Sequence, residues 1–323
     1  MTGMREKTKN DLLMLAAGIV IYAVVQSLIS IGFIQDYWER NIVYVCINII
    51  LATSLNLING ITGQFSIGHA GFMAVGAYVG AIMTVKFGLP LVAGIVAGAL
   101  GAAVLGFIIG LPTLRLTGDY LAIATLGLGE IIRITILNIP YVGGASGFMG
   151  IPKLTNFTWA FFLMLFVLFF IKNFVNSTHG RACISIRENE IAAEAMGIDT
   201  TKYKVMAFTL GAAFAGVAGA LFSHYTYIAH PASFTFMRSF DILTMVVLGG
   251  LGSMSGSIVG AIFFTWVSAF FAEWPEWRMV IYSLLLIVLM LFRPQGLFGN
   301  KELSLKMFGR LTGGERRGTT QGN

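Results

Sequence analysis

The sequence predicts an all-α polytopic membrane protein, and three observations support this fold class. Hydrophobic residues make up 56% of the 323 residues, and only 11% are charged, whereas soluble domains carry about 25% charged residues. The apolar residues form long unbroken runs, such as 12–34 and 284–292. Runs of ~20 apolar residues match a ~30 Å hydrocarbon core. Because they do not alternate with polar residues, they indicate helices and not the strands of a membrane barrel.

We expect about ten membrane segments. They lie at 11–34, 41–58, 66–85, 91–111, 119–139, 159–175, 204–224, 240–252, 257–272 and 278–293. Segment 240–252 is too short to span, so it either re-enters the membrane or forms a hairpin with the next segment. Most lysine and arginine residues fall on one side of this arrangement. Because cytoplasmic loops are enriched in these residues, both termini are expected in the cytoplasm.

The chain divides into three parts on this interpretation. Residues 1–10 form a cytoplasmic N-terminus, and 11–299 form the transmembrane domain, with a cytoplasmic loop at 176–203. Residues 300–323 form a cytoplasmic tail whose polar, glycine-rich composition predicts disorder. The net charge of +6 is explained by the basic cytoplasmic loops, and no nucleic-acid partner is expected.

Glycine interrupts the apolar sequence in GITGQFSIGHAGFMAVGAYVG, residues 60–80. Asn59 and Gly60 favour a turn and are expected to end the preceding helix. Ser66 is expected to cap the next helix through its side-chain oxygen. Small residues at four-residue spacing, among them Gly76 and Gly80, predict a seam where helix backbones approach closely.

Three polar residues of this stretch are candidates for the translocation path, namely Gln64, Ser66 and His69. Non-helical backbone at membrane depth is tolerated where protein or a water-filled cavity covers it, and broken helices in transporters end at the substrate. The alternative is that these side chains only cap helices and form hydrogen bonds between them.

Glu130 and Arg133 lie within the fifth predicted segment, in LGLGEIIRITIL. Because they are three residues apart, they are neighbours on one helix face. Charged groups inside a membrane indicate a functional site. The two residues therefore either belong to the translocation path or its gate, or form a structural ion pair.

The sequence offers no site for metal or nucleotide chemistry. It has only two cysteines, Cys46 and Cys183, and no HExxH motif, so neither a metal site nor a disulfide framework is expected. It also has no Gly-Lys pair and therefore no P-loop. We expect no catalytic residues and no cofactor bound by this chain.

The loop 176–203 contains RENEIAAEAMG, which predicts one short helix at 187–197 ended by Gly197. A helix of this length is marginal alone in water. It either docks against a cytoplasmic partner or simply connects two membrane segments.

Four separated blocks resemble the permeases of branched-chain amino-acid ABC importers, the LivH/LivM family. They are GQFSIGHAGFMAVGAY, RLTGDYLAIATLGLGEIIR, VLGGLGSMSGSIVGA and the stretch that begins ENEIAAEAMGIDTTKYKV. The second block and GGASGFMGIP are closer to the LivM type. The resemblance implies a loop that couples to an ATPase, and it assigns that role to Arg187, Glu190, Ala193, Glu194, Ala195 and Gly197.

The resemblance also implies partners and a location. The partners are a second, LivH-like permease, two cytoplasmic ATPases that use ATP, and an extracytoplasmic substrate-binding protein. The location is the inner membrane of a prokaryote. The family includes permeases for urea and short-chain amides, so these substrates stay open beside branched-chain amino acids. A secondary transporter that needs no ATPase is the alternative from another class.

The scarcity of unpaired charges within the predicted segments bears on the substrate. A strongly charged solute would find no complementary side chain at the midplane, where an ion is costly to desolvate. A zwitterion with an apolar side chain, or a small neutral amide, is easier to accommodate.

Overall fold

The computed structural model describes residues 18–272 and isolated positions on either side, at 16, 274, 280, 284, 287, 291 and 292. Within this part the chain is helical, apart from loops and one isolated β-bridge between Phe148 and Ala229. The helices are Gly18–Ser30, α2 Asp36–Asn56, α3 His69–Val85, α4 Leu91–Thr113, α5 Asp119–Leu137, α6 Phe157–Val175, α7 Thr178–Glu188, α8 Glu190–Ala195, α9 Thr200–Thr226, α10 Phe236–Gly249 and α11 Met254–Phe270. Short helical turns are η1 Leu57–Ile61, η2 Pro140–Val142, η3 Gly144–Ser146 and η4 Pro231–Phe234.

Each predicted membrane segment up to residue 272 contains a helix. Five of the described helices are long and apolar enough to cross a membrane, namely α2 with η1, α4, α5, α6 and α9. Three shorter helices are also apolar: Gly18–Ser30, α3 and α11. Segment 278–293, the N-terminus 1–10 and the tail 300–323 lie outside the described residues. The number of segments and the sides of the termini therefore stay predictions.

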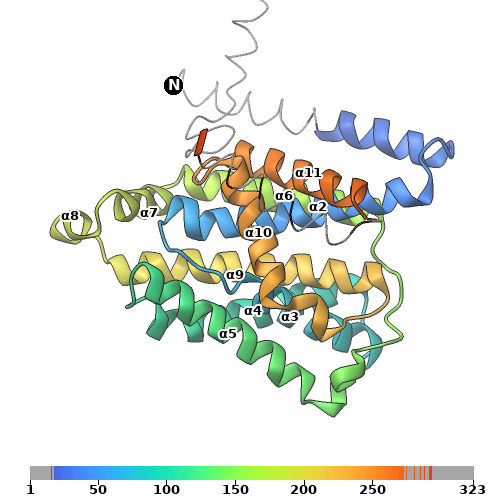
Figure 1. Cartoon of the computed structure of the whole chain (residues 1–323), viewed down its shortest axis with the longest axis horizontal. Coiled ribbons are helices and arrows are strands. Elements are labelled where there is room, and N and C mark those ends of the chain that lie inside the picture. The colour runs from blue at the N-terminus through green and yellow to red at the C-terminus, as the bar shows by residue number, and fades with distance from the viewer. Residues whose placement is uncertain are drawn as a thin grey trace, which may run out of the picture.

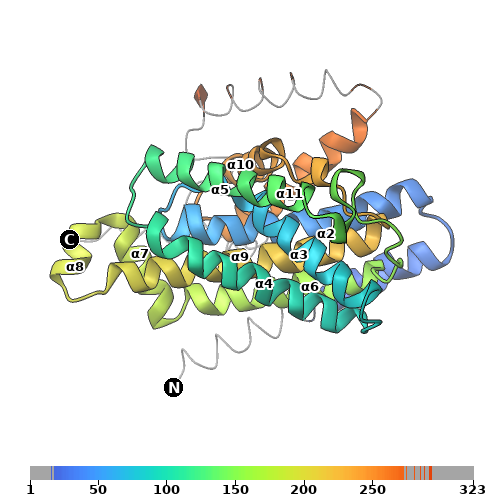
Figure 2. The ribbon, with the colours of Figure 1, turned by 90° about the horizontal axis from the view of Figure 1, so that it is seen from below.

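Most helices lie along the long axis of the molecule, and α10 runs across this direction and packs against α2 and α11 (Figure 1). The central helices are α2 and α9, because 78% and 72% of their most apolar stretches are buried. Only 17% of the corresponding stretch of α5 is buried, so α5 lies at the outside. Helices α7 and α8 project beyond the others at one end of the molecule in both views (Figure 2). We call this the α8 end and the opposite end the far end.

A glycine seam joins α3, α4 and α9, as the small-residue spacing predicts. A Cβ atom added to Gly76 would lie 2.1 Å from the carbonyl oxygen of Gly216, and one added to Gly98 would lie 2.7 Å from the carbonyl oxygen of Gly76. Both distances are shorter than van der Waals contact, so the three backbones meet where any side chain would force them apart. Close backbone approach of this kind is how small residues drive helix packing in membranes.

Two predicted boundaries in the glycine-rich stretch are wrong. Helix α2 does not end at Asn59 and Gly60 but continues through η1 to Ile61. Ser66 does not cap the next helix, which begins at His69 with Gly68 in the capping position. The physical reason is that the Asn59 side chain binds the Ser66 backbone, accepting from its N–H at 3.2 Å and donating to its carbonyl at 3.1 Å. Ser66 is thereby held outside the helix.

The short segment expected at 240–252 is part of a hairpin. Helix α10 begins earlier than predicted, at Phe236, and ends at Gly249, and α11 begins at Met254. The turn at 250–253 accommodates Gly250 and Gly252, which both have positive φ. The hairpin alternative is therefore confirmed.

Candidate functional site

The connection between η1 and α3 runs back toward the middle of the molecule (Figure 1). We call its residues segment 62–68. At its end, the His69 Nε2 atom lies 2.8 Å from Ser54 Oγ of α2. Ser54 precedes Ile61, the last residue of η1, by about 10 Å of helix at 1.5 Å per residue. Helix α3 therefore starts well inside the bundle rather than at its surface.

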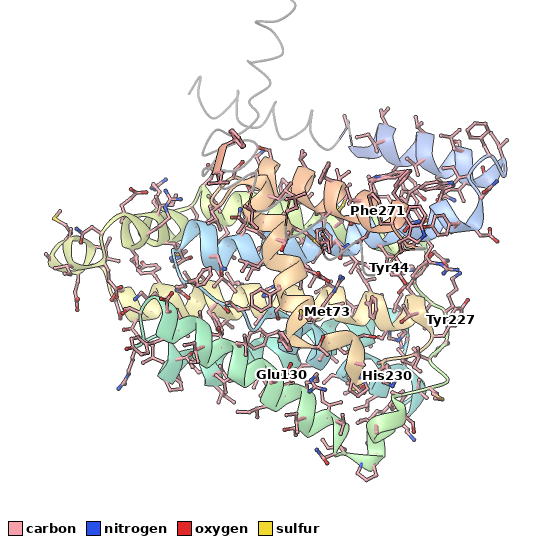
Figure 3. The ribbon with its side chains drawn as sticks, viewed as in Figure 1. Tyr44, Met73, Glu130, Tyr227, His230 and Phe271 are labelled. Atoms are coloured by element: carbon pink, nitrogen blue, oxygen red, sulfur yellow. The ribbon has the colours of Figure 1, made fainter. Side chains whose placement is uncertain are left out.

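A second connection does the same from the far end. The chain leaves α9 at Thr226, passes through segment 227–235 and enters α10 at Phe236. The Phe236 N–H donates to Glu130 Oε1 at 2.9 Å, in the middle part of α5 (Figure 3). Helix α10 therefore also starts part-way along the bundle, beside α5.

The starts of α3 and α10 meet. The backbone N–H of Ala70, in the first turn of α3, donates to Ser239 Oγ of α10 at 3.0 Å. The N–H of Ile67 donates to Thr125 Oγ1 of α5 at 3.1 Å. Two helix N-termini, each with a partial positive charge, thus adjoin next to Glu130. We call this place the junction. Helix ends of this kind at mid-depth are typical of transporter binding sites.

Glu130 and Arg133 form an ion pair, which was one of the two alternatives. Arg133 Nε lies 2.7 Å from Glu130 Oε2, and each side chain is 22% exposed. The other Glu130 oxygen accepts the Phe236 N–H. Glu130 therefore does more than neutralise Arg133, because it fixes the start of α10 at the junction. Its role in the translocation path stays a prediction.

Gln64, Ser66 and His69 are all buried in or next to segment 62–68. Several of their polar atoms have no protein partner, namely both amide atoms of Gln64, Ser66 Oγ and His69 Nδ1. An unmade hydrogen bond at a buried polar atom costs about 1–3 kcal/mol. Segment 62–68 would therefore gain hydrogen bonds if it changed its arrangement or contacted a polar solute.

The predicted helix 187–197 is wrong as a single element. Asn189 has an extended backbone, with φ of −161°, and separates α7 from α8. Its side-chain oxygen accepts the Ala192 N–H at 3.0 Å and so begins α8. The competing principle is N-capping, because asparagine stabilises a helix start better than a helix interior. Gly197, with φ of +83°, follows the end of α8 as expected.

The six coupling-loop residues point in different directions. Three contact the rest of the chain: Ala193 is buried, Glu190 forms an ion pair with Lys204 of α9, and Arg187 donates to the Gly60 carbonyl. The others, Glu194, Ala195 and Gly197, are exposed.

Sequence reasoning missed two apolar side chains that lie among the six coupling-loop residues in the sequence. Ile191 is 81% exposed and Met196 is 83% exposed. They lie in a polar loop outside the predicted membrane segments, and that placement is the signal that would have identified them.

The apolar helices indicate a multi-pass membrane protein, and helices that start inside the bundle are typical of transporters. The chain matches, over residues 37–290, the family described as the permease component of branched-chain amino acid transport systems, and it belongs to that family.

Two similar relatives are high-affinity branched-chain amino acid transport system permease proteins LivM. The protein of Salmonella typhimurium is 35% identical, over 93% of this chain and 78% of its own length. That of Escherichia coli K12 is 36% identical, over 84% and 72%. The permease protein LivH of E. coli K12 is 27% identical, over 79% of this chain and 92% of its own length.

Proposed function

We propose that this chain is a permease subunit of an ATP-driven importer for branched-chain amino acids in the cytoplasmic membrane of a prokaryote, and that it is not itself an enzyme. The observation that carries the proposal is the family match over most of the chain, together with the LivM relatives. The broken helices that meet at the junction support it, because helices that start inside the membrane domain are typical of transporter binding sites.

The energy comes from separate subunits on this proposal. The sequence has no Gly-Lys pair and hence no P-loop. Two cytoplasmic ATPases would bind ATP, and an extracytoplasmic binding protein would deliver the substrate. The similarity to both LivM and LivH supports a LivH-like second permease as partner.

Helix α8 is the surface that we assign to the ATPase. It lies at the outermost part of the α8 end (Figure 2). Ile191 and Met196 are almost fully exposed there, next to the exposed Glu194 and Ala195. Apolar side chains on a short helix outside the membrane are typical of a docking surface.

The outer face of α5 and α10 is the surface that we assign to the second permease and the path between the two subunits. Glu130 and Arg133 are partly exposed on α5, and the Asp241 side chain is 40% exposed on α10. Charged groups at membrane depth are costly against lipid, so protein or water must cover them. Helix α4, in contrast, carries no charged residue and suits lipid.

The substrate test uses vesicles that contain the chain, its LivH-like partner, both ATPases and the binding protein. We expect ATP-dependent leucine uptake that isoleucine and valine inhibit and that lysine, glutamate and urea do not. Uptake inhibited by urea but not by leucine would instead identify a urea or amide permease. Flux through this chain alone, with no ATPase present, would identify a secondary transporter.

The docking test replaces one exposed methionine at each end of the molecule. Met196→Asp, as well as Glu194→Lys, is expected to reduce copurification of the ATPases and substrate-stimulated ATP hydrolysis, while capture of substrate by the binding protein persists. Met149→Asp is the matched control, because Met149 is 64% exposed and lies at the far end beside the Phe148 bridge. Normal substrate-stimulated hydrolysis in both α8 variants would contradict the assignment.

A further inference from the structure

Three segments that are distant in sequence meet at the α8 end. They are the last turns of α2 and η1, the end of α7, and the turn between α10 and α11. Asn56 joins the first to the third, because its side-chain oxygen accepts the Gly252 N–H at 2.8 Å and its amide donates to the Ser253 carbonyl at 3.1 Å. Arg187 joins the second to the first by donating from Nη1 to the Gly60 carbonyl at 3.0 Å.

The Arg187 guanidinium is held from both sides. Its Nε and Nη2 atoms donate to Glu188 Oε1 at 3.1 and 2.6 Å, which leaves Nη1 for the Gly60 carbonyl. The planar fork of arginine can make both sets of bonds at once. The Arg187 side chain is 29% exposed and that of Glu188 is 67% exposed. Glu188 thus binds the guanidinium from the water-exposed side, and the Nη1 atom faces the interior.

The contact leaves no free space. A Cβ atom on Gly60 would lie 2.3 Å from the Gly252 nitrogen, and a Cβ on Gly252 would lie 2.9 Å from Arg187 Nη1. A Cβ on Gly63 would lie 3.0 Å from Arg187 Cγ. The three segments are therefore closely packed at this point, as protein interiors generally are.

Both neighbouring segments lead to the junction. From Gly60 the chain continues directly into segment 62–68, which carries the buried polar atoms without partners, and then into α3. From Gly252 the chain leads back along α10 to Ser239 and Phe236, which bind the start of α3 and Glu130. On the other side, only Asn189 separates α7 from α8.

We propose that Arg187 is a positioning residue that transmits movement of α8 to the junction by holding the Gly60 carbonyl and the adjacent α10–α11 turn. This inference rests on the proposed function, because it takes an ATPase bound at α8 as the source of the movement. It assigns Arg187 an inward role, distinct from contact with the ATPase. Loss of the bond uncouples ATP hydrolysis from opening of segment 62–68.

The experiment uses the complete complex with Gln64→Cys as a reporter in segment 62–68. Cys46 and Cys183 are both buried and stay in place. ATP is expected to change the rate at which a maleimide modifies the reporter.

In Arg187→Met the ATPases still copurify, but the ATP response of the reporter is lost. Measured without the reporter substitution, substrate moved per ATP falls about tenfold, the scale of one hydrogen bond from a charged donor. A lysine at this position can reach the Gly60 carbonyl but not also Glu188. Arg187→Lys is therefore expected to retain part of the reporter response and part of the substrate moved per ATP.

The matched control is Arg181→Met, because Arg181 is an exposed arginine of the same helix whose guanidinium donates to the nearby Asn176 carbonyl, at 3.4 Å. It is expected to behave as wild type. Glu188→Gln changes an exposed side chain and is expected to lower the substrate moved per ATP by an intermediate amount. It therefore serves as the test if Arg187→Met fails to assemble. Wild-type coupling and reporter response in an assembled Arg187→Met complex would overturn the proposal. If Arg187→Met fails to assemble, wild-type values in both Arg187→Lys and Glu188→Gln would overturn it. Absence of amino-acid uptake in the unmodified complex would contradict the proposed function, whereas the reporter response would still test Arg187.

Discussion

Segments 62–68 and 227–235 both lead into a helix that starts inside the bundle, but they differ in how they are held. Segment 227–235 is fastened on several sides. Phe148 and Ala229 exchange backbone hydrogen bonds of 2.9 and 3.0 Å, and Tyr78 Oη donates to the Ala229 carbonyl at 2.7 Å. Segment 62–68 is held by Asn59 and Thr125 but buries polar atoms that have no protein partner.

We expect the two segments to differ in mobility, because regions that open at low free energy are those with few satisfied contacts. Segment 227–235 is expected to act as a platform that sets the start of α10 at the junction. Segment 62–68, which is tied to Arg187 at the α8 end, is expected to be the variable segment. The two connections thus have separate roles at one site.

The largest expected effect comes from exchanging the charges that fix the platform. The double variant Glu130→Arg with Arg133→Glu keeps the charges balanced, but an arginine at position 130 cannot accept the Phe236 N–H. We expect uptake to be lost and the free energy of unfolding to fall by about 2–3 kcal/mol, the size of a hydrogen bond to a charged group. Glu130→Gln, which keeps an acceptor oxygen, is the control. Uptake at the wild-type rate in the exchanged protein would rule out a role of Glu130 and Arg133 in the translocation path. It would also rule out the role of Glu130 in fixing the start of α10.

A second change loosens the variable segment. Asn59→Ala removes both bonds to the Ser66 backbone and leaves two buried groups unpaired. The free energy of unfolding should fall by about 2 kcal/mol, and amide hydrogen exchange should rise within 62–68. Protection of segment 227–235 should not change. Equal loss of protection in both segments would show that they are one unit and not two.

A smaller effect is expected when the platform loses one neutral hydrogen bond. Tyr78→Phe keeps the ring packed against Phe234 and removes only the bond to the Ala229 carbonyl. The expected loss is about 1 kcal/mol, measured by thermal unfolding, with faster exchange confined to 227–235. Faster exchange at 62–68 in this variant would contradict the separation of the two segments.

The smallest effect concerns Cys183 in α7, outside the membrane helices. Burial raises the pKa of this thiol to about 11. Because the thiolate is the reactive form, modification by iodoacetamide is expected to be very slow at pH 7 and to rise by about tenfold per pH unit, followed by mass spectrometry. Rapid modification at pH 7 would show that α7 opens readily and is too loosely held to transmit movement.

Much of the fold could be predicted because it depends on local sequence. Helices α4 and α6 lie within a few residues of the predicted segments, since a continuous apolar run defines each one. The seam at Gly76 was predicted from residue spacing, and the ion pair of Glu130 and Arg133 from their separation by three positions.

The remaining features depend on segments far apart in sequence. The Phe236 N–H binds Glu130, and the Gly60 carbonyl binds Arg187, although these partners are more than a hundred residues apart. The backbone of Ser66 is likewise taken by Asn59, which overrides the capping preference of serine. Spacing along one helix carries no information about such partners.

The glycine seam also constrains the order in which the protein can be built. Gly76 and Gly98 enter the membrane early in synthesis, but their third partner, Gly216, emerges only after α5, α6, α7 and α8 have been made. Until then, the small residues of α3 and α4 that face α9 lack their partner helix. The permease core therefore assembles late, because a chain truncated before residue 216 would lack the third backbone of the seam.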